Sequence, residues 1–548
     1  MLVDYVIVGA GSAGCVLSDR LTESGQFTVL LLEAGGNPRR WMDMPLAWRD
    51  SYKSPRVNWG YVSDPEPWAD GRSVAAHRGK VLGGTSSING MLYARGFAAD
   101  YDRWRNDGLR GWGYADVLAY FRKAETSWRG GGLFHGADGP LTVSRHVPEP
   151  SLHAALAATA RKHGIDCPDD IYASNDSQFG VPDFTIRGGR RASTAAAYLA
   201  RALKRKNLQV ISQAQVTRIE IVGGRATAVL YRRGGQTVHV SARREVIVAA
   251  GAFNSPQLLL LSGIGPAAEL ALLGIEPVRN LPGVGKNLQD HHAINFAYRL
   301  DPDVSFDRQL RIDRMVRSVI QWMLFGTGSA SRVPVAGQIF RCIDAMSGWP
   351  DMQMVIAPVA LDARLWLPGW RSSVGDQLTA SNVLLRPRST GEVSLRTPSP
   401  YDAPRLRFNL LADPLDRACF RSMVRFTERF FASAPISDFL RGRVSPPAPL
   451  VSDSEIDAFV RERIATAMHP AGTCAMGIGD MAVLDHECRV RDVEGVRVVD
   501  ASAMPHVVSG NTNAPVIMMA EKVSDLILGA SAAAELTPHD PGSSRHRP

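Results

Sequence analysis

The chain has 548 residues, of which 45% are hydrophobic and 21% are charged. These proportions are ordinary for a globular protein, and they exclude a disordered or fibrous chain. The formal net charge is +8, but the basic residues are scattered along the chain rather than concentrated in one stripe, so no nucleic-acid partner is expected.

The cysteines and the apolar segments indicate an intracellular protein. The 6 Cys residues show no paired or framework spacing, so no disulfide is expected. No window reaches the roughly 18 apolar residues of a membrane span, and the first residues lack the basic and apolar regions of a signal peptide. We therefore predict a cytoplasmic protein without a transmembrane segment. Its charge is compatible with loose contact with an anionic membrane, and the oligomeric state is left open.

The N-terminal segment predicts a dinucleotide-binding unit. The segment that begins at Asp4 predicts a short buried strand, and Gly9-Ala-Gly-Ser-Ala-Gly14 follows at once. Helical apolar spacing then leads to a second apolar run, 28–32, which is followed by Glu33. Strand, glycine turn, helix, strand and acidic residue in this order are the βαβ fingerprint. The expected cofactor contacts in this unit are Gly9, Gly11, Ser12, Ala13, Gly14, Glu33 and Ala34.

Each part of this unit has a physical role. Gly9 permits the tight turn, Gly11 lets a pyrophosphate approach the backbone, and Gly14 lets the helix pack closely on the strand. The helix N-terminus offers free N–H groups to the phosphates. Glu33 would bind the ribose, which disfavours NADP, but this segment alone does not decide between FAD and NAD.

Four further segments carry conspicuous motifs. They are 79–96 (GKVLGGTSSINGMLYARG), 251–265 (GAFNSPQLLLLSGIG), 468–477 (MHPAGTCAMG), and the pair 499–505 (VDASAMP) and 511–515 (NTNAP). Together with the βαβ unit, these collinear segments resemble the signatures of the glucose–methanol–choline (GMC) oxidoreductase family, in particular its choline-dehydrogenase-like bacterial alcohol dehydrogenases. The resemblance spans residues 4 to about 529.

The resemblance implies an α/β protein (α+β overall). A Rossmann-like FAD-binding domain, discontinuous in sequence, is expected over 1–150, 191–290 and 481–530. A substrate domain built on an antiparallel sheet with flanking helices is expected over 151–190 and 291–480. The polar tail 532–548 is expected to be disordered. The implied activity is alcohol oxidation by hydride transfer to FAD.

Two residues are expected to carry the chemistry. Removing a hydride from a carbinol carbon requires a base that takes the hydroxyl proton, and a neutral imidazole suits this task near neutral pH. His469 matches the family's base position. Asn513 matches the second active-site position, where an amide would hold the substrate oxygen toward His469; helix capping is the alternative for Asn513. An amphipathic helix predicted over 515–529 would direct its positive N-terminus at the flavin.

The resemblance also assigns the remaining FAD contacts. They are Gly83, Gly84, Ser87, Asn89, Gly90 and Met91 along the flavin and pyrophosphate, Val216 at the adenine, Ala250 and Gly251 at a second glycine-tipped strand, and Asp500, Ala501, Thr512 and Asn513 in the closing motifs. Some relatives attach FAD covalently through a His in the first segment. Ile88 stands at that position and has no nucleophile, so noncovalent FAD is expected.

The chain departs from choline-oxidising relatives at one position. Those relatives carry a Glu before Ala-Gly, where this chain has Val335, and no acidic residue lies between 329 and 343. A quaternary ammonium needs a carboxylate or an aromatic cage, so we expect a neutral, primary alcohol. His291 and His292 are expected to be structural residues near the substrate entrance, without a metal, because no third ligand joins them. His506 receives no role.

Several alternatives remain open at this point. We expect a dehydrogenase, but an oxygen-using oxidase and a choline or polyol dehydrogenase are alternatives within the family. The electron acceptor, a quinone or oxygen, cannot be derived from motif spacing. A cyanohydrin lyase with structural FAD and a flavin-binding protein without catalysis are alternatives of other classes.

Overall fold

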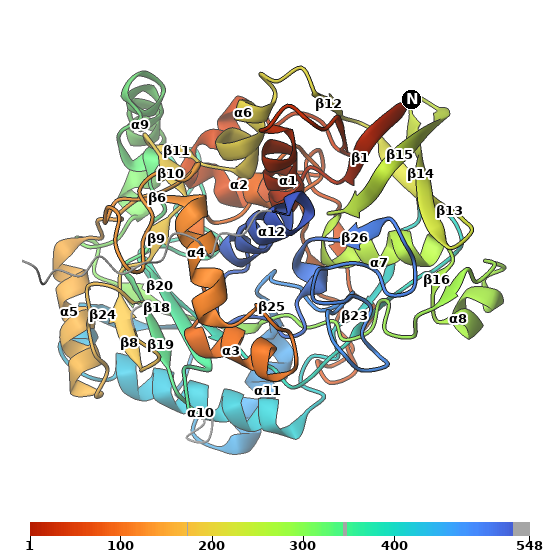
Figure 1. The fold of residues 1–548 in the computed structure, drawn as a ribbon. Helices are drawn as coiled ribbons and strands as arrows, with labels where there is room; N and C mark the ends of the chain where they lie inside the picture. Colours follow the sequence, from red (N-terminus) through yellow and green to blue (C-terminus); the bar gives the residue numbers. More distant parts are fainter. Residues whose placement is uncertain (172–173, 344–347, 530–548) are drawn as a thin grey trace, which may run out of the picture.

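Two seven-stranded sheets organise the chain (Figure 1). The computed structural model describes residues 1–171, 174–343 and 348–529. The tail 532–548, for which disorder was predicted, lies outside the described residues.

The first sheet contains the predicted βαβ unit. Its order is β12-β2-β1-β15-β14-β13, with β26 beside β15. The pairs β12–β2, β2–β1, β1–β15 and β15–β26 are parallel, whereas β13–β14 and β14–β15 are antiparallel. The strands are β1 (Leu2–Val8), β2 (Val29–Leu32), β12 (Leu208–Ile211), β13 (Gln215–Val222), β14 (Arg225–Arg233), β15 (Gln236–Val248) and β26 (Val496–Val498).

Helices cover the parallel part of this sheet, which explains its apolar strands. All four residues of β2 are buried, as expected for a parallel strand enclosed on both faces. Helix α1 (Ser12–Thr22) packs on β1 and β2 in the parallel part, while α7 (Gly251–Leu261) packs on β13 in the antiparallel part. This covering places the carboxyl ends of β1 and β2 against the start of α1.

The C-terminal helix differs from its predicted character. Helix α12 runs from Asn513 to Leu528, but residues 514–525 are all buried, so it is not amphipathic. It packs between α1 and α4 (Tyr114–Ala124), and this position removes the solvent-facing side that the spacing of apolar residues suggested.

The second sheet is antiparallel throughout. Its order is β24-β18-β21-β20-β19-β8, with β25 beside β18. Helices α5 (Pro150–Lys162), α10 (Pro414–Phe431) and α11 (Asp453–Arg463) pack against it. The strands are β8 (Gln178–Gly180), β18 (His292–Leu300), β19 (Gly337–Arg341), β20 (Met352–Ala357), β21 (Gln377–Leu384), β24 (Leu440–Ser445) and β25 (Ala465–Thr466).

The expected fold class is therefore confirmed: a mixed α/β chain with a parallel-rich sheet assembled from distant segments, and an antiparallel sheet flanked by helices. The domain boundaries themselves remain a prediction. The remaining α-helices are α2 (Trp48–Lys53), α3 (Ala98–Asn106), α6 (Ala200–Ala202), α8 (Ala267–Leu272) and α9 (Ile312–Phe325). The remaining strands form the pairs β3 (Tyr61–Val62) with β4 (Ala75–Ala76), β5 (Leu92–Tyr93) with β9 (Asp183–Phe184), β6 (Glu125–Ser127) with β7 (Leu141–Val143), β10 (Ile186–Arg187) with β11 (Arg190–Arg191), β16 (Ile264–Gly265) with β17 (Arg279–Asn280), and β22 (Glu392–Ser394) with β23 (Arg405–Arg407).

Candidate active site

A cavity of about 590 Å³ lies between the two sheets. On one side its wall is formed by the carboxyl ends of β1, β2 and β15, where open parallel sheets bind their ligands. On the other side it is formed by alternate residues of β20 and β21, in the cross-strand pairs Gln353–Val383, Val355–Ser381 and Ala357–Thr379. The cavity therefore joins a nucleotide-type wall to a sheet face that can shape a substrate.

The glycine turn leaves space only at its central glycine. A Cβ on Gly9, whose φ is +100°, would lie 2.6 Å from the Ala249 carbonyl oxygen, and one on Gly14 would lie 1.9 Å from the Gly9 carbonyl oxygen. A Cβ on Gly11 would meet nothing closer than 3.8 Å, although Gly11 lines the cavity. The missing side chain at Gly11 thus opens a cradle in which a cofactor can approach the backbone.

The start of α1 and the end of β2 fit the two ends of an adenosine diphosphate group. Gly11 is the N-cap of α1 and makes no side-chain cap hydrogen bond. The N–H groups of the first turn, which begins with Ser12 and Ala13, are therefore available to an anion. The Glu33 carboxylate accepts hydrogen bonds from the N–H groups of Ala10 (2.9 Å) and Gly35 (2.7 Å). Burial raises the pKa of the Glu33 carboxyl to about 7. Glu33 and Ala34 line the cavity.

The segment after Lys80 lines the cavity only in part. Gly84, Ile88, Asn89, Gly90 and Met91 face it. Gly83 and Ser87, which were expected beside the flavin, are not among the lining residues: the Ser87 hydroxyl donates to the Leu82 carbonyl oxygen (2.8 Å). Gly83 and Ser87 lie on the side of the loop that faces away from the cavity. They are in close contact there, since a Cβ on Gly83 would lie 2.3 Å from Ser87 Oγ.

Gly14, which was also predicted to contact the cofactor, does not line the cavity and instead packs on the Gly9 carbonyl oxygen. The cofactor contacts predicted after residue 200 all line the cavity. They are Val216, Ala250, Gly251, Asp500, Ala501, Thr512 and Asn513. Asp500 is already well bonded, because its Oδ2 accepts from the Gly251 N–H (2.8 Å) and the Ser255 hydroxyl (2.6 Å). Its Oδ1 accepts from the N–H and hydroxyl of Ser502. Asp500 therefore joins the start of α7 to the loop that follows β26.

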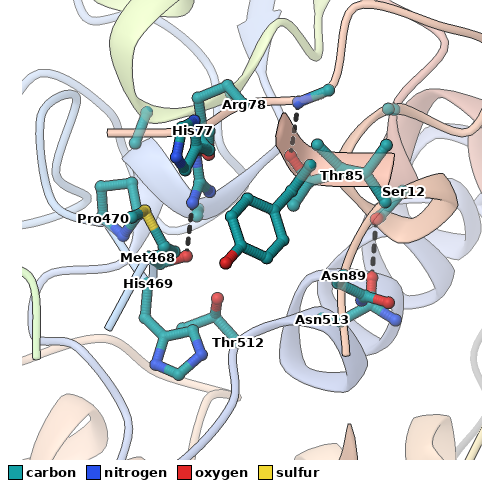
Figure 2. Close-up of a pocket in the computed structure, with 18 of the residues that line it drawn as sticks. Ser12, His77, Arg78, Thr85, Asn89, Met468, His469, Pro470, Thr512 and Asn513 are labelled. Carbon is teal, nitrogen blue, oxygen red and sulfur yellow. Dashed lines mark hydrogen bonds between the residues drawn. The ribbon is translucent and has the colours of Figure 1, made fainter. Parts of the chain in front are cut away.

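His469 lies in the loop after β25, facing the cavity between two polar partners. Its Nε2 is 2.9 Å from Asn511 Nδ2, and its Nδ1 is 2.9 Å from His291 Nδ1. Its backbone N–H donates to Asp290 Oδ1 (2.8 Å), and Arg78 donates to the carbonyl oxygen of the preceding Met468. Figure 2 shows the imidazole across the pocket from Ser12 and Asn89. The ring is thus fixed through both nitrogens and through its backbone.

The expectation for Asn513 does not hold. Asn513 is the first residue of α12, and its Oδ1 accepts from the Ser12 hydroxyl (2.7 Å), far from the imidazole in Figure 2. The capping alternative is not observed either, because the N-cap is Thr512 and it makes no side-chain cap bond. The amide that faces His469 belongs to Asn511. Asn511, in the loop before α12, and Asn513, at its first residue, are only two positions apart and could not be told apart from spacing.

His291 also differs from its prediction. Its side chain is fully buried rather than near an entrance, and it lies edge-on to His469 with ring centroids 5.1 Å apart. His292 is buried beside it, as the first residue of β18. One usable signal for His291 was its place directly after the Asn-Leu-Gln-Asp run, but its contact with residue 469 has no signal in the sequence.

The surroundings of His469 favour its neutral form. Burial, followed by the neighbouring His291 and the positive charge of Arg78, lowers the pKa of His469 well below its usual value. The Asn511 amide N–H points at Nε2, so the lone pair lies on Nε2 and the proton on Nδ1, where it is donated to His291. This tautomer presents a basic nitrogen on the cavity side of the ring.

The charged groups beyond the cofactor wall are cationic. Arg49, which the sequence did not indicate, lines the cavity and donates to the Ala360 carbonyl oxygen (2.8 Å). Among the described residues no carboxylate comes within salt-bridge distance of it, and its guanidinium lies 5.2 Å from the Trp48 ring centre. Arg78 is the second cation. The acidic lining residues, Glu33 and Asp500, lie at the nucleotide-type wall.

Comparison with known proteins gives the family. Two models described as GMC oxidoreductase match residues 3–293 and 387–520. The chain belongs to the GMC oxidoreductase family, whose typical cofactor is FAD and whose enzymes act on CH–OH groups. The glycine cradle, the free start of α1 and the carboxylate of Glu33 are the parts that fit such a dinucleotide.

Individual relatives cover nearly the whole chain. The oxygen-dependent choline dehydrogenase of Paraburkholderia phymatum is 44% identical over 97% of this chain and 94% of its own length. That of Burkholderia multivorans is 44% identical over 96% and 93%. The crystal structure of pyridoxine 4-oxidase from Mesorbium loti has a TM-score of 0.85 at 26% identity, covering 96% of this chain and 99% of that one. A formate oxidase variant of Aspergillus oryzae has a TM-score of 0.89 at 26% identity, covering 96% and 98%.

Proposed function

We propose that this enzyme oxidises a neutral, primary alcohol to the aldehyde, with His469 as the general base and FAD as the hydride acceptor. The observation that supports this most is the fixed, neutral imidazole of His469 on the cavity wall, opposite the glycine cradle. The dehydrogenase activity, the cytoplasmic location and the domain boundaries 1–150, 191–290 and 481–530 against 151–190 and 291–480 are part of the same proposal.

In the proposed reaction the substrate hydroxyl takes the place of the Asn511 amide N–H at His469 Nε2 and donates its proton to that nitrogen. FAD, when bound, supplies the acceptor for the hydride that leaves the carbinol carbon. His291 then accepts a hydrogen bond from the His469 Nδ1–H and stabilises the imidazolium as it forms. Asn511 holds the substrate oxygen at the imidazole. The N-terminus of α12 lies at Ser12 rather than at the imidazole, and would place its partial positive charge beside bound flavin.

The cavity favours a neutral substrate over a cation. Beyond the nucleotide-type wall its charged residues are Arg49 and Arg78, both cationic, and Val335 contributes an apolar side chain. Choline is the second candidate, because relatives at 44% identity are oxygen-dependent choline dehydrogenases. The rings of Trp48 and Tyr52, 5.5 Å apart at the cavity wall, are a further feature that suits a quaternary ammonium.

Initial rates with a panel of alcohols distinguish the two candidates. Using one artificial electron acceptor throughout, we expect kcat/KM for benzylic and aliphatic primary alcohols to exceed that for choline by about tenfold or more, the effect of one unfavourable charge contact. Choline as the best substrate of the panel would overturn the proposal of a neutral alcohol.

The attachment of FAD and the electron acceptor have direct tests. Ile88 lines the cavity and offers no nucleophile, so acid precipitation of the holoenzyme is expected to release all the flavin into the supernatant. Flavin that stays with the pellet would contradict noncovalent binding.

Stopped-flow reoxidation of the reduced enzyme by a quinone is expected to be faster than its reoxidation by oxygen, as for a dehydrogenase.

Replacing Asn511 is expected to impair catalysis more than replacing Asn513. Asn511→Ala removes the amide beside Nε2, and kcat/KM should fall about 10- to 100-fold, the value of one hydrogen bond to a charged group. Asn513→Ala removes the bond to Ser12, and its main effect should be on flavin retention. Equal losses of kcat/KM at full flavin content would contradict this assignment.

The pH profile should show a base that stays neutral in mild acid. A general base works unprotonated, and the pKa of His469 lies below its ordinary value of 6.5, so activity is lost only as pH falls through that lowered pKa. The acidic limb of kcat/KM is therefore expected below pH 6.5. The matched control is Asp290→Asn, because burial raises the pKa of the Asp290 carboxyl to about 7. A limb near pH 7 that disappears in this variant would assign the titration to Asp290 instead.

A further inference from the structure

Helix α9 carries an apolar face that no other part of the described chain covers. Met315, Ser318 and Trp322 are buried on its inner side. In Figure 1 the helix stands out from the surface at the upper left. Its outer side exposes the large apolar side chains of Val316 (54% exposed), Ile320 (52%), Met323 (62%) and Leu324 (68%), and its last residue, Phe325 (74%), is exposed at the C-terminal end of the helix. Single exposed apolar residues are ordinary, but a cluster on one helix marks a contact surface.

The loop 361–371 packs against the start of α9 and exposes further apolar side chains. It joins the start of α9 through the Ile312 N–H, which donates to the Trp366 carbonyl oxygen (2.9 Å). The loop exposes Leu361 (50%), Leu365 (45%) and Trp370 (72%). The eight residues Val316, Ile320, Met323, Leu324, Phe325, Leu361, Leu365 and Trp370 are named the α9 patch below.

Arginines surround the α9 patch. At the end of α9, Trp322 Nε1 donates to the Gly189 carbonyl oxygen (2.8 Å) in the turn between β10 and β11, which places the arginines of that hairpin beside the helix. The helix and the loop add others. Exposed arginines without a carboxylate in salt-bridge distance among the described residues are Arg187, Arg190, Arg314, Arg317, Arg364 and Arg371. The acids of the helix and the loop are Asp313, which pairs with Arg311 (2.6 Å), and Asp362.

The α9 patch borders the candidate active site. The inner side of α9 packs in one cluster with Leu310, Val359 and Ala357. Ala357 also lines the cavity, as does Leu361, which is half exposed. The α9 patch is therefore next to the Ala357 end of the cavity, whereas the Gln353–Val383 pair lines the other end.

We propose that the α9 patch docks this enzyme on the surface of an anionic lipid bilayer. A helix that lies in the interface plane inserts an apolar face and places Lys or Arg beside the headgroups, which is the arrangement seen here. In the described part of the chain no helix is both long and apolar enough to cross a bilayer. A second copy is a poorer occupant, because a two-fold contact would bring the same arginines face to face.

Docking in this way would direct the Leu361 end of the cavity at the bilayer. A lipid-soluble alcohol or electron acceptor could then enter without crossing water. This consequence rests on the proposed function, whereas docking itself does not, and the test below measures docking without activity.

Co-sedimentation of the holoenzyme with vesicles tests the proposal. We expect binding to phosphatidylcholine–phosphatidylglycerol vesicles at low salt, and about tenfold or more weaker binding to pure phosphatidylcholine vesicles or at high salt. The double variant Ile320→Ser/Leu324→Ser, and separately Arg364→Gln/Arg371→Gln, should each lower the binding to anionic vesicles about tenfold or more. The matched control is Leu272→Ser, since Leu272 is 87% exposed on α8; it should bind like the unmodified protein.

Turnover with a water-soluble acceptor should be unchanged in all these variants, which shows that they are folded. Absence of binding to the anionic vesicles, or binding that Ile320→Ser/Leu324→Ser leaves intact, would overturn the proposal. Sedimentation velocity gives the remaining outcome: a dimer that this double variant dissociates, without vesicle binding, would assign the patch to a second copy and would also overturn it.

Discussion

His469→Ala is expected to lower kcat by roughly 10²- to 10⁴-fold, the usual contribution of a general base, while the flavin stays bound. The imidazole contacts His291 and Asn511 rather than the glycine cradle, so its removal should not disturb cofactor binding. The hydroxyl proton would then have no acceptor in place when the hydride leaves. The measurement is steady-state kcat with the best alcohol of the panel, together with the flavin-to-protein absorbance ratio.

A second histidine serves as the control for this variant. His506 Nε2 pairs with Asp107 (2.9 Å) outside the cavity, so His506→Ala should keep nearly full turnover. Near-normal turnover in His469→Ala would mean that another group takes the proton. Loss of flavin in His469→Ala would mean that the residue is structural.

Two glycines of the first turn should fail in different ways. Gly14→Ala places a methyl group 1.9 Å from the Gly9 carbonyl oxygen, and because both atoms belong to the backbone core of the βαβ unit, rotation of a side chain cannot relieve the clash. We expect little soluble holoenzyme. Gly11→Ala meets nothing closer than 3.8 Å, so the protein should fold but bind FAD about 10- to 100-fold more weakly, the cost of one lost charge-assisted hydrogen bond.

Gly36→Ala is the control for both, because a Cβ there has no atom within 4 Å. The measurements are the soluble yield, the thermal midpoint of the apoprotein and the FAD dissociation constant by fluorescence titration. If Gly11→Ala retained unmodified FAD affinity, the pyrophosphate would have to lie elsewhere.

The fold could largely be predicted, because its determinants are local. The run Gly9 to Gly14, the apolar strands on both sides and Glu33 are contiguous, so spacing alone defines the βαβ unit. The antiparallel second sheet could be predicted only from the family resemblance, because its strands belong to segments far apart in the sequence, such as 178–180 and 377–384. The buried environment of α12 could not be derived, because apolar spacing does not reveal how many neighbours a helix has.

The candidate site was predicted less completely. His469 follows from its motif and lies at the cavity, but its partners come from loops whose side-chain directions no periodicity encodes. Asn511 rather than Asn513 faces the imidazole, and His291 contacts it across 178 positions of sequence. Gly83 and Ser87 support the cofactor loop rather than line it. Arg49 belongs to no motif.

Anaerobic mixing of the purified holoenzyme with the best alcohol tests the central claim most directly. The yellow flavin absorbance should bleach in a single turnover, and a deuterium on the carbinol carbon should slow the bleaching in the unmodified protein. His469→Ala should bleach much more slowly under the same conditions. A flavin that stays yellow with every alcohol, as in a lyase or a simple flavin-binding protein, would contradict the claim that this cavity takes a proton and a hydride from an alcohol.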